Sequence, residues 1–186
     1  SGLSLATMAR NSLATASGSS RPSCSTRMPR SAPMASAVRI CSDGTEAKVF
    51  SILDGMGIKR LNQAGIAVAW ISGRASGATS VRATELRVPH LIQGRTDKLN
   101  ALNELLAATG IDQQEVCYAG DDWLDIPVLN RVGLAVTVAD ADAVVRQHAH
   151  WITSRPGGQG AVREICDLIL AAQGLDQRVL DGILGQ

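Results

Sequence analysis

The chain has 186 residues, with 18 Lys and Arg against 17 Asp and Glu and a formal net charge of +1. This length suits one domain with room for a sizeable apolar core. The balanced charge gives no electrostatic case for a nucleic-acid partner or an acidic membrane. No apolar run approaches the roughly 20 residues that a membrane helix needs. We therefore expect no nucleic-acid and no membrane partner.

The four cysteines, Cys24, Cys41, Cys117 and Cys166, are scattered along the chain without Cys-x-x-Cys spacing. Cys117 and Cys166 stand in apolar periodic segments, which is typical of buried free thiols. Free thiols suit a reducing compartment, so we expect a cytoplasmic protein.

The first 38 residues differ in composition from the rest of the chain. They are rich in Ser, Ala, Thr and Arg, they show no strand or helix period, and no acidic residue precedes Asp43. Such a segment cannot bury enough apolar surface to offset its ordering entropy, so we predict that residues 1–38 are poorly ordered or loosely packed. Residues 39–175 are expected to form the folded core, and residues 176–186 a C-terminal tail.

From Asp43 onward, strand and helix patterns alternate along the chain. Short apolar runs predict strands at residues 66–72, 90–93, 116–119, 134–138 and 151–153. Helical periodicity appears at residues 55–64, 76–86, 97–109, 124–131, 141–148 and 161–173, and Gly65, Gly110 and Gly133 fall where helices should stop. This alternation implies βαβ units, and therefore an α/β fold with a Rossmann-like parallel sheet flanked by helices.

The most informative motif is Gly120-Asp121-Asp122, which follows the apolar run at residues 116–119. The carboxyl ends of strands in such folds open into the ligand crevice, and carboxylates placed there suit a hard cation such as Mg²⁺. Asp125 lies four residues after Asp121, so it can turn back toward it across one helical turn. A turn followed by a helix start is the alternative interpretation, because Asp is a favoured N-cap.

Two further strand ends carry polar side chains. Ser72, Gly73 and Arg74 follow one strand and offer a hydroxyl, an amide and a guanidinium to a phosphate, although Ser-Gly after a strand is also a common turn. Lys98 stands in the first turn of a predicted helix, where the helix dipole disfavours a cation. A functional ammonium group and a solvated surface lysine are both consistent with that position.

The order Ser, then Lys, then Gly-Asp-Asp-x-x-x-Asp resembles the haloacid dehalogenase superfamily of phosphotransferases. Within it, the chain looks most like the phosphatases of 3-deoxy-D-manno-octulosonate 8-phosphate, from about Asp43 to Gln173. The stretches that carry the resemblance are residues 43–50, 53–59, 71–74, 93–98, 120–128 and 157–164. The resemblance implies a Mg²⁺-dependent phosphomonoesterase that acts on a sugar-acid phosphate in lipopolysaccharide precursor synthesis.

The resemblance also implies a role for individual residues. Asp121 would be the Mg²⁺ ligand and Asp125 its supporter, while Ser72 and Lys98 would hold the phosphate and neutralise charge developing in the transition state. Lys59 stands where family members often carry Arg, so it keeps the charge and loses the bidentate fork. The residues implied to face the substrate are Ser51, Ile52, Leu53, Asp54, Gly55, Lys59, Gly73, Arg74, Arg82 and Lys98.

The spacing leaves no room for a lid domain, because only about two secondary elements fit between Ser72 and Lys98. In this respect the chain resembles capless members of the superfamily, which cover an open site by assembling as tetramers. The resemblance therefore implies a homotetramer. Residues 157–164 and the C-terminal tail are the expected places for that contact.

The superfamily's nucleophile is the first Asp of Asp-x-Asp-Gly at the end of the first strand, and the second Asp acts as acid and base. Counting back from Gly44 without gaps, those two positions hold Met28 and Arg30. A transit peptide, a degenerate homologue and translation in a shifted reading frame all account for this, and we favour the last.

The missing acids leave two alternatives to the eight-carbon phosphatase. One is a non-catalytic sugar-phosphate-binding or assembly subunit, and the other is an acylneuraminate 9-phosphate phosphatase. The motifs at residues 93–98 and 157–164 favour the eight-carbon substrate over the nine-carbon one.

Overall fold

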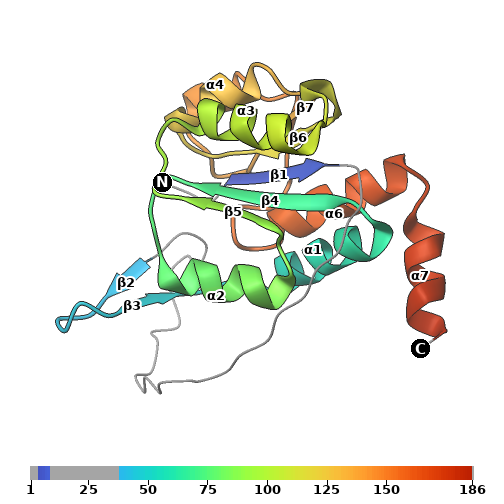
Figure 1. The fold of residues 1–186 in the computed structure, drawn as a ribbon, viewed down its shortest axis with the longest axis horizontal. Coiled ribbons are helices and arrows are strands. Elements are labelled where there is room, and N and C mark those ends of the chain that lie inside the picture. The colour runs from blue at the N-terminus through green and yellow to red at the C-terminus, as the bar shows by residue number, and fades with distance from the viewer. Residues whose placement is uncertain (1–3, 9–37, 186) are drawn as a thin grey trace.

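The structure, a computed structural model, describes residues 4–8 and 38–185. A six-stranded sheet lies between two layers of helices, with α3 and α4 on one face and α1 and α6 on the other (Figure 1). The predicted α/β class, with parallel strands flanked by helices, is confirmed.

The main sheet has the strand order β5-β4-β1-β6-β7-β8. Its strands are β1 (Ser4–Met8), β4 (Ala67–Ser72), β5 (His90–Gln93), β6 (Cys117–Ala119), β7 (Leu134–Thr137) and β8 (Trp151–Ile152). The pairs β4–β5, β6–β7 and β7–β8 are parallel. All five predicted strands are therefore confirmed, with ends within one residue of those expected.

Strand β1 is the exception, and the sequence did not predict it. It lies at the centre of the sheet and runs antiparallel to both neighbours, with Ser4 opposite Ile71 and Leu5 opposite Ala119. The prediction that residues 1–38 are poorly ordered or loosely packed is wrong for Ser4–Met8, which form a strand where Ala6 is fully buried. Without this strand, β4 and β6 would each bury a row of unpaired backbone groups, so non-local pairing overrides a weak local signal.

Residues 1–3 and 9–37 of that segment lie outside the described part of the chain, and Cys24, Met28 and Arg30 are among them.

The six predicted helices are all present, although two of them are single turns. The helices are α1 (Ile52–Ala64), α2 (Gly77–Leu86), α3 (Lys98–Thr109), α4 (Ile126–Leu129), α5 (Ala143–Arg146), α6 (Ala161–Ala172) and α7 (Asp176–Leu184), with 3₁₀ turns η1 (Gln113–Glu115) and η2 (Trp123–Asp125). Helix α7 was not predicted and occupies the segment expected to be a tail. It packs against α1 and α6 and buries Val179.

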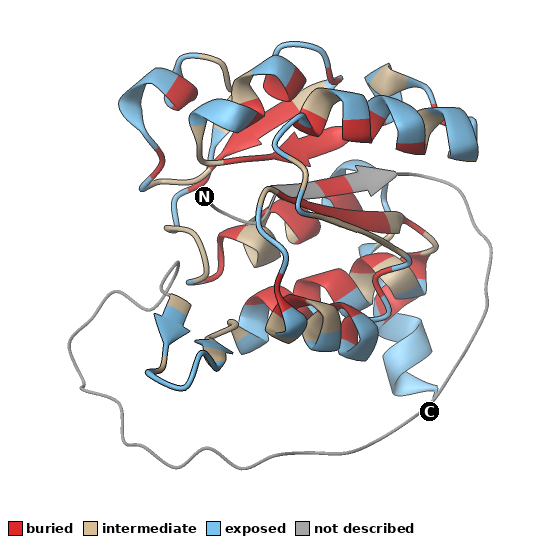
Figure 2. Cartoon of the chain, turned by 60° about the vertical axis from the view of Figure 1, so that its left-hand side comes forward, coloured by how far each residue is buried: buried red, intermediate tan, exposed pale blue. Residues whose placement is uncertain are grey.

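The core lies on both faces of the sheet, which is why the strands read as nearly continuous apolar runs. Successive side chains of β4 point to opposite faces. Val68 and Trp70 pack in the cluster that includes α1 and α6, whereas Ala69 and Ile71 pack in the cluster that includes α3 and α4. Buried residues accordingly line the strands and the inner faces of the helices (Figure 2).

Outside the main sheet, β2 (Val38–Ile40) and β3 (Glu46–Lys48) form an antiparallel hairpin beside α2 (Figure 1). In its turn, the Asp43 carboxylate accepts hydrogen bonds from the backbone N–H and the hydroxyl of Thr45. Asp43 is therefore a turn residue.

Between Ser72 and Lys98 the chain holds only α2 and β5, so no lid domain is inserted there. Within the described ranges, no helix is long and apolar enough to cross a membrane. Cys41, Cys117 and Cys166 are free thiols, as predicted for the last two.

Candidate active site

Three parallel strands deliver polar groups to one edge of the sheet. β4 ends at Ser72, β5 leads through a short loop to Lys98 at the start of α3, and β6 leads to Gly120 and Asp121. The backbone N–H of Arg95 donates to the Ser72 carbonyl at 3.1 Å, which joins the first two loops. Ligands in open α/β sheets bind at this edge, so the position fits a site.

The centre of this edge is a buried ion pair between Lys98 and Asp125. Lys98 Nζ lies 2.8 Å from Asp125 Oδ1, and both side chains are fully buried. The Tyr118 hydroxyl donates to the same Oδ1 at 2.6 Å, and the Asp122 amide donates to Oδ2 at 3.2 Å. Asp125 therefore fixes the position of the ammonium group, a contact the sequence did not predict.

Two neighbours make this arrangement possible. A Cβ added at Gly120 would lie 2.3 Å from Asp125 Cγ, so the carboxylate packs directly on the glycine backbone. The role of Tyr118 was missed, although a hydroxyl in an otherwise apolar buried strand was the available signal.

Asp121 is half-buried, and its Oδ1 atom has no hydrogen-bond partner among the described residues. Burial raises the pKa of Asp121, the nearby Asp125 carboxylate adds to that rise, and Lys98 opposes it. An unsatisfied carboxylate oxygen at this position suits a proton or a cation.

The described residues do not complete a metal site around Asp121. No group of three or more His, Cys, Asp or Glu gathers in the described part of the chain. Asp122 accepts from the Trp123 amide and Asp125 is bound to Lys98, so both acids already have partners. Because Mg²⁺ requires near-octahedral oxygen coordination, Asp121 is a candidate ligand and not a site by itself.

Ser72 and Arg74 form a closed turn at the end of β4. The Ser72 hydroxyl donates to the Arg74 carbonyl at 2.8 Å and accepts from the Arg74 amide at 3.2 Å. The buried hydroxyl thus has turn partners, which is the alternative that the sequence left open. Binding a phosphate requires it to rotate away from the Arg74 carbonyl. A Cβ on Gly73 would lie 3.8 Å from Thr96, so the turn contacts the loop before Lys98.

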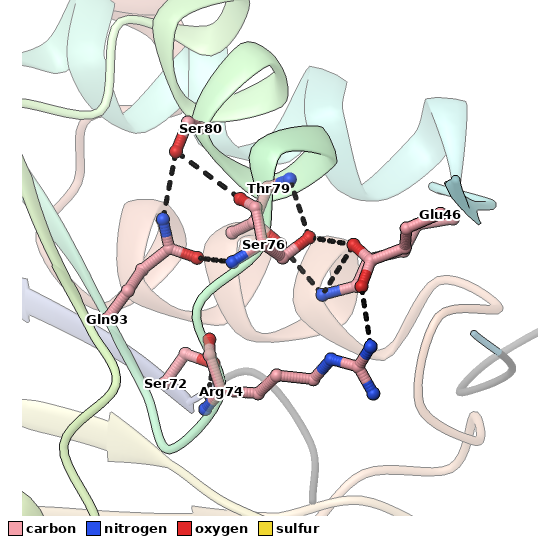
Figure 3. Close-up of polar contacts among 8 residues, drawn as sticks. Glu46, Ser72, Arg74, Ser76, Thr79, Ser80 and Gln93 are labelled. Atoms are coloured by element: carbon pink, nitrogen blue, oxygen red, sulfur yellow. Dashed lines mark hydrogen bonds and ion pairs between the residues drawn. The ribbon is translucent and has the colours of Figure 1, made fainter. Parts of the chain in front are cut away.

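The hairpin contacts this turn through Glu46 (Figure 3). Glu46 Oε2 lies 2.8 Å from Arg74 Nη2, and Oε1 accepts a hydrogen bond from the Ser76 hydroxyl. Gln93 accepts from the Ser76 amide at 2.9 Å. The Ser76 hydroxyl, then Lys48 and Arg74, hold the pKa of Glu46 below its ordinary value. Neither Glu46 nor Gln93 was predicted from the sequence as a site residue.

The predicted substrate loop caps two helices. Ser51 is the N-cap of α1 and accepts from the Asp54 amide at 3.3 Å. The buried Asp54 carboxylate accepts from the Arg163 amide at 3.0 Å and the Gly160 amide at 3.4 Å. Helix α6 has no side-chain cap of its own at Gly160, so Asp54 supplies one and favourably places an anion at its N-terminus.

Arg82 reaches this loop from α2. Its Nη2 donates to the Ser51 carbonyl at 3.3 Å, its Nη1 pairs with Glu85 at 2.7 Å, and the guanidinium lies over the Phe50 ring at 5.9 Å. A Cβ on Gly55 would lie 2.3 Å from Nη2, so Gly55 leaves the space that Arg82 fills.

A shallow cavity of about 400 Å³ opens beside Arg82, lined by Phe50, Ile52, Ala78, Val81, Arg82 and Glu85. Ile52, Leu53 and Lys59 are exposed. The structure thus brings Ser51, Gly55 and Arg82 together. Lys98 and Asp125 form another group with Tyr118, and their charges affect the pKa of Asp121.

Comparison with known proteins agrees with this geometry. Residues 76–165 match the family of haloacid dehalogenase-like hydrolases. A 3-deoxy-D-manno-octulosonate 8-phosphate phosphatase from Yersinia pestis is 48% identical over 132 residues, which cover 71% of each chain.

Solved structures show the same likeness. A probable YrbI family phosphatase from Pseudomonas syringae superimposes with a TM-score of 0.77 at 47% identity, covering 80% of this chain and 84% of its own. The 3-deoxy-D-manno-octulosonate 8-phosphate phosphatase from Moraxella catarrhalis, in complex with magnesium, phosphate and KDO, has a TM-score of 0.75 at 39% identity, covering 78% of this chain and 84% of its own.

The fold and the strand-end acids define a haloacid dehalogenase-like hydrolase. At the identity and coverage found, the chain belongs to the family of 3-deoxy-D-manno-octulosonate 8-phosphate phosphatases. The family predicted from the sequence is confirmed.

Proposed function

We propose that this chain binds 3-deoxy-D-manno-octulosonate 8-phosphate at the carboxyl edge of the sheet, and that the site is built for hydrolysis of the phosphate monoester. Membership in a family of phosphatases named for this substrate supports the proposal. The cations also suit the ligand, because a sugar-acid phosphate carries both a carboxylate and a phosphate. Lys98 and Ser72 are assigned to the phosphate, and Arg74 and Arg82 to the sugar acid, with Lys59, Gly73 and residues 51–55 around it.

Lys98 is suited to stabilising charge on a phosphate because its position is fixed. The ion pair with Asp125 and the Tyr118 hydrogen bond hold the ammonium group before any ligand arrives. A preorganised charge in a site of low water content costs no reorganisation when negative charge develops. Asp121 is the proposed contact for Mg²⁺, the metal in the Moraxella catarrhalis relative. With one free ligand among the described residues, metal affinity is expected to be weak.

The expected rate of hydrolysis depends on which residues the central strand supplies. β1 fills the place between β4 and β6, its residues Ser4–Met8 include no acid, and it runs in the opposite direction to its neighbours. The described residues therefore supply no carboxylate at the end of the central strand, where the family's nucleophile belongs. Positioning and electrostatics do not replace a nucleophile, so we expect hydrolysis at background level. This observation favours the non-catalytic binding subunit as the second candidate function.

Phosphate release from 3-deoxy-D-manno-octulosonate 8-phosphate, measured with and without Mg²⁺, tests the proposal alongside calorimetric binding. We expect binding with background turnover. A variant with an Asp-x-Asp-Gly strand ahead of Asp43 should gain activity, and Asp121→Ala in that variant should abolish it. Vigorous Mg²⁺-dependent turnover by the unmodified chain would show that the central strand is not limiting. Failure to bind the ligand would refute the proposal.

We also propose that the protein is a cytoplasmic homotetramer. The absence of a lid between Ser72 and Lys98 and the exposed apolar side chains of α7, among them Ile183 and Leu184, support the assembly. Light scattering during size-exclusion chromatography measures the mass directly, and a monomer at micromolar concentration would contradict it.

A further inference from the structure

The hairpin β2–β3 is bound to the turn that carries Arg74, although the two are far apart in the sequence. Glu46 pairs with Arg74 at 2.8 Å and accepts from the Ser76 hydroxyl, while Lys48 Nζ donates to Thr79 at 3.0 Å. These contacts tie β3 to the loop after β4 and to the first turn of α2 (Figure 3). The hairpin therefore determines where the loop and its guanidinium lie.

From this geometry we infer that Glu46 is a positioning residue for Arg74, which it holds ready for the carboxylate of the sugar-acid ligand. The inference rests on the proposed function, because that proposal assigns Arg74 to the sugar acid. Glu46 itself is not assigned to any contact with the ligand.

Arg74 needs such support because its side chain is 45% exposed and long. An arginine loses roughly 2 kcal/mol of rotamer entropy when it is ordered. Because Glu46 orders Arg74 in the free protein, ligand binding does not have to include this entropy loss. The guanidinium has five N–H donors, so pairing with one carboxylate leaves donors for a second.

Glu46 is itself held firmly, which a positioning residue requires. Its side chain is 18% exposed, and the Ser76 hydroxyl binds one oxygen while Arg74 binds the other. Ser76 is in turn fixed by Gln93 of β5, which accepts from its amide at 2.9 Å and donates to Ser80 at 2.9 Å. Lys48 Nζ lies 4.0 Å from one Glu46 oxygen and Arg74 Nη2 lies 2.8 Å from the other, so two cations face one carboxylate and the cluster keeps a positive charge for an anionic ligand.

The test is calorimetry on the full chain with two probes, 3-deoxy-D-manno-octulosonate 8-phosphate and inorganic phosphate. We expect Glu46→Gln to weaken the sugar-acid phosphate about fivefold to tenfold, the scale of one lost ordering contact, and to leave inorganic phosphate unchanged. In an Arg74→Met background, Glu46→Gln should have no further effect, because the group that it positions is gone. The matched control is Glu104→Gln, which removes another Glu–Arg pair, 3.0 Å from Arg95, and should change neither affinity.

Other outcomes overturn the inference. Unchanged binding of the sugar-acid phosphate by Glu46→Gln would show that Glu46 has no role in binding. Tighter binding would show that Glu46 competes with the ligand for Arg74. Equal weakening of both probes would show a general effect on the loop, and so would an additive effect in the Arg74→Met background. If the unmodified chain binds neither probe, the proposed function fails, and the inference falls with it.

Discussion

Two ion pairs support the candidate site, and they differ in their exposure to water. Lys98 and Asp125 are fully buried beside Tyr118, whereas Arg74 is half-exposed where it meets Glu46. Removing one partner of a buried pair leaves an uncompensated charge in an apolar interior. Removing one partner of an exposed pair leaves a charge that water solvates. We therefore expect the first pair to govern stability and the second to govern ligand recognition.

The largest expected effect is that of Lys98→Met. It leaves the Asp125 carboxylate buried without its cation, which costs on the order of 3–5 kcal/mol of unfolding free energy. Guanidinium denaturation followed by tryptophan fluorescence measures this change. The matched control is Lys59→Met, which alters an exposed lysine and should change stability little. A loss below about 1 kcal/mol would show that water reaches the pair.

A smaller effect is expected for Tyr118→Phe, which keeps the ring in the core and removes the hydroxyl that donates to Asp125 at 2.6 Å. A hydrogen bond to a charged group contributes about 1.5–3 kcal/mol, and Lys98 and the Asp122 amide still satisfy the carboxylate, so we expect the low end of that range. In the Asp125→Asn background the same substitution should cost less, as measured by a double-mutant cycle. Additive losses would show that Tyr118 acts through packing alone.

The smallest effect is expected for Glu46→Gln, and it should depend on pH. Because the pKa of Glu46 lies below its ordinary value of 4.5, its carboxylate adds stability above that pH and loses this contribution as the pH falls through the lowered pKa. The variant should therefore melt slightly below the unmodified chain near neutrality and together with it in strong acid. Thermal unfolding across this range provides the measurement. A gap that widens toward acid would contradict the predicted direction.

A second contrast, between local and distant contacts, explains which features could be predicted from the sequence. The strands from residue 66 onward were predictable because their apolar runs and glycine stops are local signals. Gly65 and Gly110 end their helices in the left-handed region, at φ 83 and 68. Gly133 was wrongly taken as a helix stop of that kind. It is required because a Cβ there would lie 1.9 Å from the Gln114 carbonyl oxygen, a contact between distant segments.

The site was predicted in part, for the same reason. The strand-end rule placed Ser72, Lys98 and Asp121 at one edge, where the structure has them. It did not reveal that Asp125 pairs with Lys98, that Asp54 turns toward α6, or that Glu46 holds Arg74, since these contacts join residues 27, 109 and 28 positions apart. Strand β1 was missed because its pairing partners, and not its own composition, make it a strand.

The direction of β1 has a practical consequence for handling the protein. Its first residue pairs with Ile71 at the end of β4, so the chain enters the sheet from the edge that carries Ser72 and Asp121. A bulky label attached at Ser4 would therefore lie beside the anion-binding groups. A label attached to α7, a helix that packs on α1 and α6, would leave that edge open for titration with ligands.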